Sequence, residues 1–84
     1  MEKTYVRVIA EFDTEGSIFP RRIIWADGNI FDIDRILEVR PAASRKYGGQ
    51  GDRYTVRIRG QHRYLYLEHG PDCGVLGRWF VEQP

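Results

Sequence analysis

Apolar and polar residues alternate along most of this chain. The alternation is clearest over residues 53–59, where Tyr54, Val56 and Ile58 share one face and mainly basic residues occupy the other. A second run covers residues 4–12, and its apolar face would carry Val6, Val8, Ala10 and Phe12. Because successive side chains of a strand point to opposite faces, this pattern predicts strands that each bury one face.

Four further segments complete the predicted set of strands: residues 17–25, 30–40, 63–68 and 78–82. Pro20 has no amide hydrogen to donate, so it predicts an edge or a bend in the first of them. Asp27-Gly28 is the strongest hairpin signal in the sequence. Six short strands with close turns are typical of small sandwiches and barrels. We therefore predict an all-β fold, a small five- to six-stranded antiparallel barrel of the SH3-like kind.

The alternation in residues 30–40 changes parity at Ile36. A bulge or a sharp bend near Asp34-Arg35 would account for the change, since barrels turn corners in this way. The competing interpretation is a helical turn over residues 34–39, with Asp34 as its N-cap.

The register of the second hairpin depends on which two residues form its turn. Gly60-Gln61 suits a type II′ turn, in which glycine takes the first central position. This choice sorts apolar from polar side chains across the two strands. The resulting cross-strand pairs are Arg59 with His62, Arg57 with Tyr64, Thr55 with Tyr66, Arg53 with Glu68, Val56 with Leu65 and Tyr54 with Leu67.

Charge is distributed unevenly along the chain, although the net charge is only +1. Residues 40–67 hold seven Lys or Arg and a single acid, Asp52, whereas residues 1–39 and 68–84 are net acidic. Arginine supplies eleven of the 13 basic residues. Its planar guanidinium favours bidentate and stacked contacts over simple solvation.

The polar face of the second hairpin combines these arginines with tyrosines. Proteins that bind single-stranded nucleic acid use charge to follow the phosphates and rings to stack on the bases. We therefore predict single-stranded nucleic acid as the first partner of this face. The candidate residues are Arg53, Arg57, Arg59, His62, Tyr64 and Tyr66, extended by Arg45, Lys46 and Tyr47 in a glycine-rich loop. The alternative is an ordinary solvated sheet face, in which Arg57 and Tyr64 form a cation–π pair.

The sequence offers no complete metal or phosphate site. A structural zinc site usually takes four ligands, often arranged in Cys-x₂₋₄-Cys or His-x₃₋₅-His pairs. The candidate ligands contain one cysteine and two histidines and form no such pair: His62, His69, Asp72 and Cys73. Residues 48–51 lack the lysine that ends a phosphate-binding loop, and they predict a loop tip. We expect no metal and no cofactor.

Catalytic groups are equally sparse. Asp32 and Asp34 alternate with apolar residues, and solvated positions paired with Arg22 or Arg35 are the favoured interpretation. The small nucleophiles other than threonine have no assigned base: Ser17, Ser44 and Cys73. We therefore expect a non-catalytic binding module. The alternative partner to nucleic acid is a protein or peptide, bound in an aromatic groove beside a tryptophan or along a strand edge.

Length and composition set the remaining bounds. The 84 residues, 1–84, suffice for one domain, and 42% hydrophobic with 30% charged residues is typical of a globular chain. The longest apolar runs span four residues, so neither a membrane span nor a membrane partner is expected. The first residues enter a strand pattern directly, without the pattern of a signal peptide. Cys73 is the only cysteine, which fits a reducing, cytoplasmic location.

Several segments resemble a group of small uncharacterised proteins from Gram-positive, clostridia-like bacteria. The segments that carry this resemblance are residues 10–16 (AEFDTEG), 25–28 (WADG), 39–44 (VRPAAS), 54–58 (YTVRI) and 79–82 (WFVE). The resemblance implies a compact β-barrel, and it brings no activity or catalytic residue that can be transferred to this chain.

Overall fold

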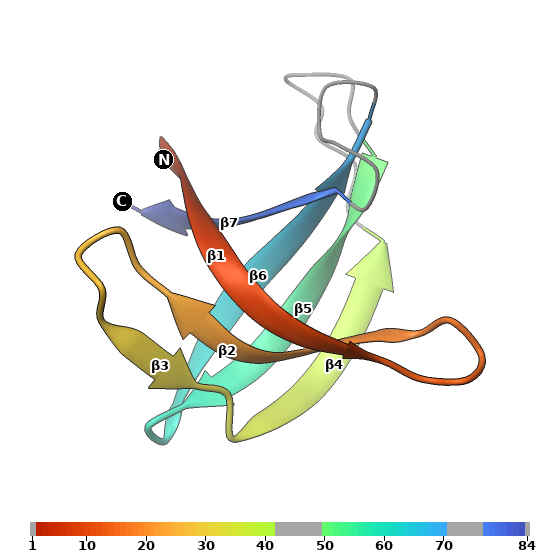
Figure 1. Cartoon of the computed structure of the whole chain (residues 1–84), viewed down its shortest axis with the longest axis horizontal. Helices are drawn as coiled ribbons and strands as arrows, with labels where there is room; N and C mark the ends of the chain where they lie inside the picture. Colours follow the sequence, from red (N-terminus) through yellow and green to blue (C-terminus); the bar gives the residue numbers. More distant parts are fainter. Residues whose placement is uncertain (1, 42–49, 71–76, 84) are drawn as a thin grey trace.

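Seven strands form a single antiparallel sheet that curls into a half-barrel (Figure 1). The computed structural model describes residues 2–41, 50–70 and 77–83. The order of strands across the sheet is β3-β2-β1-β7-β6-β5-β4. The strands are β1 (Glu2–Phe12), β2 (Ile18–Ile24), β3 (Ile30–Asp32), β4 (Arg35–Pro41), β5 (Gln50–Ile58), β6 (Gln61–His69) and β7 (Arg78–Gln83).

A sharp bend between β3 and β4 joins the two ends of the sheet. The amide of Ile33 donates to the carbonyl of Arg21 on β2 at 2.9 Å, and the amide of Asp34 donates to the carbonyl of Arg57 on β5 at 2.8 Å. The chain therefore crosses from one end of the sheet to the other within these two residues. The predicted bend is confirmed, and the helical turn over residues 34–39 is wrong. The bend also divides one expected strand in two, so the described chain has seven strands rather than five or six.

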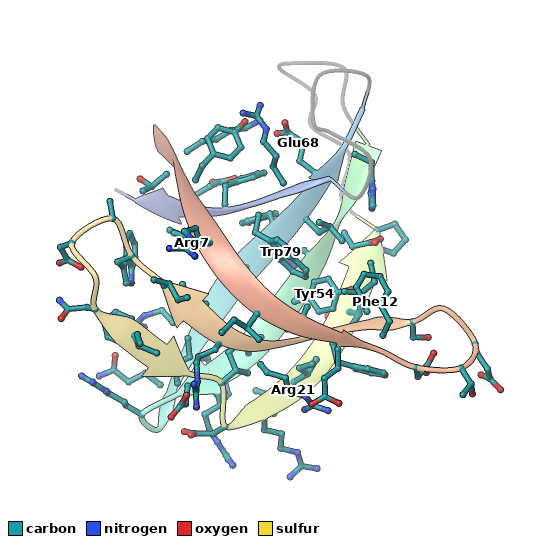
Figure 2. All side chains as sticks on the ribbon, in the orientation of Figure 1. Arg7, Phe12, Arg21, Tyr54, Glu68 and Trp79 are labelled. Carbon is teal, nitrogen blue, oxygen red and sulfur yellow. The ribbon has the colours of Figure 1, made fainter. Side chains whose placement is uncertain are left out.

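The core lies on the concave face of the sheet. Its buried members are Ile23, Ile33, Tyr54, Val56, Leu65 and Leu67. Trp79 packs against this cluster, with its ring centroid 5.3 Å from that of Tyr54. Figure 2 shows both rings in the space that the curled strands enclose. The alternation of residues 53–59 thus identifies the buried face of β5 correctly.

Both turns that depend on Asp and Gly form as their sequences indicate. Gly28 has φ of 90°, and its amide donates to the carbonyl of Trp25, which closes the β2–β3 hairpin. In the β1–β2 turn, the Asp13 carboxylate accepts hydrogen bonds from the amides of Glu15 and Ser17. The short polar side chain of aspartate satisfies the backbone donors of a turn in this way.

A bulge interrupts the pairing of β1 with β2. Ile9 pairs with Arg22, but the next residue, Ala10, pairs with Pro20. The extra residue, Arg21, lies on β2, where it separates the buried Pro20 from the buried Ile23. β1 keeps its alternation through Ala10, but Phe12 at its end, which was expected on the buried face, is 55% exposed. Pro20 is buried, and β3 extends too little to pair beside it, so its missing amide hydrogen costs no ladder bond there.

The β5–β6 hairpin has a different register from the expected one. Arg59 and Gly60 form the turn, with φ of 51° and 77°, which is the type I′ conformation. The expected pairs are therefore wrong by two positions. The observed pairs are Arg57 with His62, Thr55 with Tyr64, Arg53 with Tyr66, Gly51 with Glu68, Val56 with Arg63 and Tyr54 with Leu65. A shift of two residues leaves every side chain on its predicted face.

The loop tip predicted at residues 48–51 is wrong for its second half, and residues 48 and 49 lie outside the described residues. Gln50 and Gly51 belong to β5, and a Cβ atom on Gly51 would lie 2.3 Å from the carbonyl oxygen of Leu67. The close approach of the two backbones explains a glycine at this place in a strand.

Of the described residues, none forms a helix long and apolar enough to cross a membrane.

Candidate functional site

An aromatic row crosses the convex face of the sheet. Phe80 on β7 is the neighbour of Tyr5 on β1 and of Tyr66 on β6. The Tyr66 ring stacks on Phe80 at 4.9 Å between centroids with 6° between planes, and Tyr5 meets Phe80 edge-on at 5.9 Å. These rings leave Phe80 only 5% exposed. The convex face therefore has a small apolar cluster of its own, outside the concave core.

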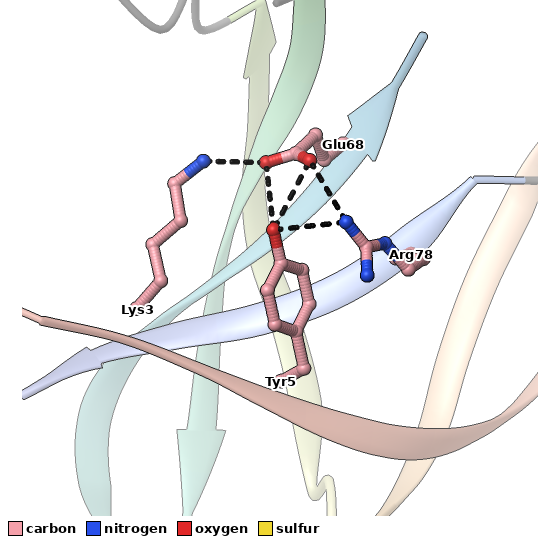
Figure 3. A network of polar contacts seen from close by, with 4 residues as sticks. All are labelled: Lys3, Tyr5, Glu68 and Arg78. Carbon is pink, nitrogen blue, oxygen red and sulfur yellow. Dashed lines mark hydrogen bonds and ion pairs between the residues drawn. The ribbon is translucent and has the colours of Figure 1, made fainter. Parts of the chain in front are cut away.

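A polar network adjoins this row and ties three strands together (Figure 3). The Glu68 carboxylate lies 2.5 Å from the Lys3 amine and 3.9 Å from the Arg78 guanidinium, and it accepts a hydrogen bond from the Tyr5 hydroxyl at 3.2 Å. The Arg78 guanidinium lies 4.1 Å from the centre of the Tyr5 ring. Because the Glu68 side chain is only 13% exposed, these partners compensate the removal of its charge from water. We assign the network a role in holding β1, β6 and β7 together.

Two of the residues predicted to bind nucleic acid interact with other side chains of the protein. The Arg53 guanidinium lies 4.7 Å from the centre of the Tyr64 ring and 3.8 Å from the Glu38 carboxylate. Tyr66 lies flat on Phe80, and burial raises the pKa of its hydroxyl, with a further contribution from the Glu82 carboxylate. Arg53 and Tyr66 thus contribute to packing and ion pairing within the folded protein.

Three other candidates remain accessible at the hairpin end of the convex face. Arg57 has Arg35 as its neighbour on β4 and His62 as its neighbour on β6. Within residues 2–41, 50–70 and 77–83, neither Arg35 nor Arg57 forms an ion pair. Tyr64 is 53% exposed. The structure therefore places Arg57, His62 and Tyr64 together and adds Arg35, which sequence reasoning missed because the β3–β4 bend decides its position.

Arg59 does not lie with this group. It is a turn residue, its guanidinium lies 4.9 Å from the centre of the Phe31 ring on β3, and its amide donates to the Asp34 carboxylate at 3.1 Å. The expected pairing of Arg59 with His62 would have kept it beside Arg57, and the observed register removes it. Arg45, Lys46 and Tyr47 lie outside the described residues.

A cleft of about 860 Å³ opens beside the first half of β6, and residues of both faces line it, including Val56 and Leu65 of the concave core and Tyr64 and Tyr66 of the convex face. Its apolar walls come from several strands: Ile23 on β2 and Trp25 directly after it, Phe31 on β3, Ile58 on β5, Leu65 on β6 and Val81 on β7. Charged residues also line it, namely Arg59, Arg63 and Glu82, together with His62. A volume of this size is within the range of small-molecule sites, roughly 300–1,000 Å³.

The cleft exists because β6 and β7 diverge. β6 pairs with β5 along its whole length, but it pairs with β7 only through Tyr66, Leu67 and Glu68. On its other edge, β7 pairs with the start of β1 from Trp79 to Gln83. Residues 61–65 of β6 therefore have a strand on one side only in the part of the chain that the structure describes.

Backbone groups of this half-strand point into the cleft. Residues 58 and 61 flank a two-residue turn and form a hydrogen-bonded pair, so residues 62 and 64 direct their amides and carbonyls away from β5. The carbonyl of His62 accepts a hydrogen bond at 3.0 Å from the guanidinium of Arg63, the next residue along β6, which also donates to the side chain of Gln61. Arg63 is paired with the buried Val56 and so belongs to the concave side. Sequence reasoning missed Arg63 because its face and neighbours follow from the observed register.

The other candidate groups are held in ordinary surface interactions. Asp32 pairs with Arg22 at 2.6 Å, as expected, whereas Asp34 accepts the Arg59 amide. The imidazole of His69 lies 3.8 Å from the Asp52 carboxylate. The described residues hold no group of three or more His, Cys, Asp or Glu side chains that could bind a metal ion. Asp72, Cys73 and Ser44 lie outside the described residues.

Comparison with protein-family models, with curated proteins and with solved structures gives no match for this chain. The site geometry must therefore carry the functional argument.

Proposed function

We propose that this protein is a non-catalytic interaction module that accepts an extended peptide as an additional strand along residues 61–65 of β6. The observation that carries the proposal is the one-sided pairing of this half-strand beside an apolar cleft. Strand addition of this kind derives affinity from main-chain hydrogen bonds and specificity from pockets for alternate side chains.

Both elements of strand addition are available at this edge. Residues 62 and 64 offer two amides and two carbonyls to an incoming backbone. Alternate side chains of the peptide would enter the cleft, where Trp25, Phe31 and Val81 provide an apolar lining. Burial of apolar surface contributes about 25 cal/mol per Å², so this lining would add to the main-chain hydrogen bonds.

The other long edge of the sheet is less suited to a partner strand. β4 carries a bulge between Ile36 and Glu38, charged residues on both sides of it, and Pro41 at its end. Bulges, charges and proline are the features with which proteins protect an edge from pairing. Among the described residues, the open half of β6 has no bulge and no proline, and the Arg63 guanidinium covers its His62 carbonyl.

The test is a pair of substitutions at residue 62, studied with peptides selected from a random decapeptide library. His62→Pro removes the outward amide without breaking a bond to β5, whereas His62→Ala keeps that amide and serves as the matched control. The wild type and His62→Ala should bind the selected peptides, and the amides of residues 62 and 64 should become protected from exchange in the wild type. Equal binding by His62→Pro, or protection elsewhere only, would reject the strand-addition proposal.

A second candidate function, binding of single-stranded nucleic acid, is favoured by the neighbouring Arg35, Arg57 and His62 on the convex face. Like charges in direct cross-strand positions are unfavourable unless another group neutralises them. A phosphate backbone would neutralise these charges. The exposed ring of Tyr64, which follows His62 on the same face of β6, is available to stack on a base.

The finer classification of the chain belongs to the same proposal. An SH3-like barrel is a common scaffold for recognition of extended peptides, and the half-barrel with its aromatic cleft is consistent with this use. The bacterial resemblance, carried by residues 10–16, 25–28, 39–44, 54–58 and 79–82, and the cytoplasmic location, inferred from the single Cys73, are predictions that we retain.

A further inference from the structure

The charges around the cleft indicate what kind of segment would fill it, and this step rests on the strand-addition proposal. Arg59 and Arg63 line the cleft near the β5–β6 turn, together with His62, while Glu82 lies with Val81 on the β7 side. Cationic groups therefore gather at the turn end of the open half-strand. A partner with negative charge at that end would be complementary to them.

Arg63 would change its hydrogen-bond partner when a peptide strand binds to this edge. In the free protein its guanidinium donates to the His62 carbonyl and to the Gln61 side chain. An incoming strand would donate its own amide to that carbonyl, because residue 62 directs its backbone groups away from β5. The Arg63 guanidinium would then be released from the carbonyl beside the newly bound peptide. A carboxylate is the group that best satisfies a guanidinium in this position.

Arg59 provides a second cation at the same end. Its guanidinium lies on the Phe31 ring and has no ion pair within the described residues. Asp34 is occupied by the backbone amide of Arg59 rather than by its guanidinium. A second carboxylate of the peptide could thus pair with Arg59 without breaking an ion pair of the protein.

The same charges argue against a second copy of this chain as the occupant. Pairing of two β6 edges about a two-fold axis would bring Arg63 and His62 of one chain close to the same residues of the other. Like charges in such proximity are unfavourable. We therefore propose that the cleft accepts an extended acidic segment, whose carboxylates meet Arg59 and Arg63 and whose apolar side chains lie on Trp25, Phe31 and Val81.

The experiment uses three blocked ten-residue peptides with valine at alternate positions. In place of the two valines nearest one end, which share the face of the other valines, the first peptide has Glu, the second Lys and the third Gln, and the intervening residues are threonine in all three. An exposed ion pair changes affinity by roughly 1.5- to 5-fold, so two pairs predict a roughly 2- to 25-fold preference for the Glu peptide over the Gln peptide. The Lys peptide should bind most weakly, and added salt should reduce the differences.

Variants locate the origin of the preference. Arg63→Gln and Arg59→Gln should each reduce the preference for Glu over Gln by about 1.5- to 5-fold. Arg7→Gln is the control, because Arg7 does not line the cleft. Titrations followed by amide chemical shifts report binding at residues 62 and 64 and, through Leu65 and Leu67, whether each variant keeps its fold.

The outcomes separate this inference from the proposed function. Equal binding of all three peptides at the β6 edge would reject acidic selectivity and support strand addition. Absence of binding by any peptide, with unchanged shifts at residues 62 and 64, would reject both. A dimer in sedimentation equilibrium whose interface protects these two amides would identify a second copy as the occupant and overturn the inference.

Discussion

The hydroxyl of Tyr54 on β5 donates a hydrogen bond at 2.9 Å to the carbonyl of Ile18 on β2. These strands lie near opposite ends of the sheet, with three strands between them. The bond therefore spans the concave side and joins the two walls of the half-barrel. Tyr54 is 4% exposed and its ring also contacts Trp79, so a single residue contributes both apolar packing and a cross-barrel hydrogen bond.

Tyr54→Phe should remove this hydrogen bond and retain the ring contact with Trp79. We expect the free energy of unfolding in urea to fall by about 0.5–1.5 kcal/mol, the usual net contribution of one hydrogen bond. Tyr64→Phe is the matched control, since Tyr64 is 53% exposed and no hydrogen bond of its hydroxyl is seen among the described residues. Equal effects of the two substitutions would show that the bond to Ile18 does not stabilise the fold.

Stability should decrease in alkaline solution because two tyrosines titrate late in the folded protein. Burial raises the pKa of Tyr54 above its ordinary value of 10.0, with the Asp52 carboxylate as a second cause, and burial likewise raises that of Tyr66. The folded state thus holds these protons more tightly than the unfolded chain. Their contribution is complete below the unfolded pKa and is lost as the pH rises through the folded pKa.

Urea midpoints measured between pH 8 and pH 11.5 test this expectation. The midpoint of the wild type should be steady with respect to tyrosine ionisation up to about pH 10 and should fall above it. In Tyr66→Phe the fall should be shallower, because one of the two late-titrating hydroxyls is absent. An unchanged slope in this variant would contradict the raised pKa of Tyr66.

Phe80 should contribute more to stability than its place on the convex face suggests. Replacement by alanine would leave a cavity beneath Tyr66 and beside Tyr5, and large-to-small substitutions of buried phenylalanine cost about 3–5 kcal/mol. Phe12→Ala is the control, because Phe12 is 55% exposed and should change stability far less. Chemical denaturation of both variants measures the difference, and similar losses would refute a second apolar cluster.

Binding of single-stranded nucleic acid is tested by its dependence on salt. If Arg35 and Arg57 each meet a phosphate, the slope of log affinity against log salt should decrease in magnitude by about 0.7 for each Arg→Gln substitution. Arg21→Gln is the control, since Arg21 pairs with Glu11 and does not neighbour Arg35 or Arg57 in the sheet. Labelled oligonucleotides of mixed sequence serve as the probe. A wild type that does not bind at about 100 µM in low salt would reject this second function.

The sequence by itself determined which face each residue of the main strands takes. The period-two pattern places Tyr54, Val56 and Ile58 on the buried side of β5, and the Asp27-Gly28 turn follows from local backbone preference. These properties depend on neighbours within a few residues, so they can be read along the chain. The bend between β3 and β4 was detectable for the same reason, as a change of parity.

The tertiary structure decided the register and the surfaces that depend on it. A slip of two residues preserves every face, so the pattern could not distinguish a turn at Gly60-Gln61 from the observed turn at Arg59-Gly60. That slip moves Arg59 onto Phe31 and changes the neighbours of Arg57. Local periodicity specifies which way a side chain points, but the position of its neighbours depends on the turn that closes.

The cleft and the apolar cluster of the convex face are harder to predict from the sequence than the faces of the strands. Whether β7 continues beside β6 beyond Phe80 depends on how the whole sheet twists and curls, and the end of this pairing leaves residues 61–65 with one open side. Phe80 is buried because Tyr5 and Tyr66, distant in sequence, close over it. The sequence determined the faces because each follows from the local alternation of residues. Only the folded sheet decided the edge that we propose as the binding site, because that edge depends on which strands remain side by side.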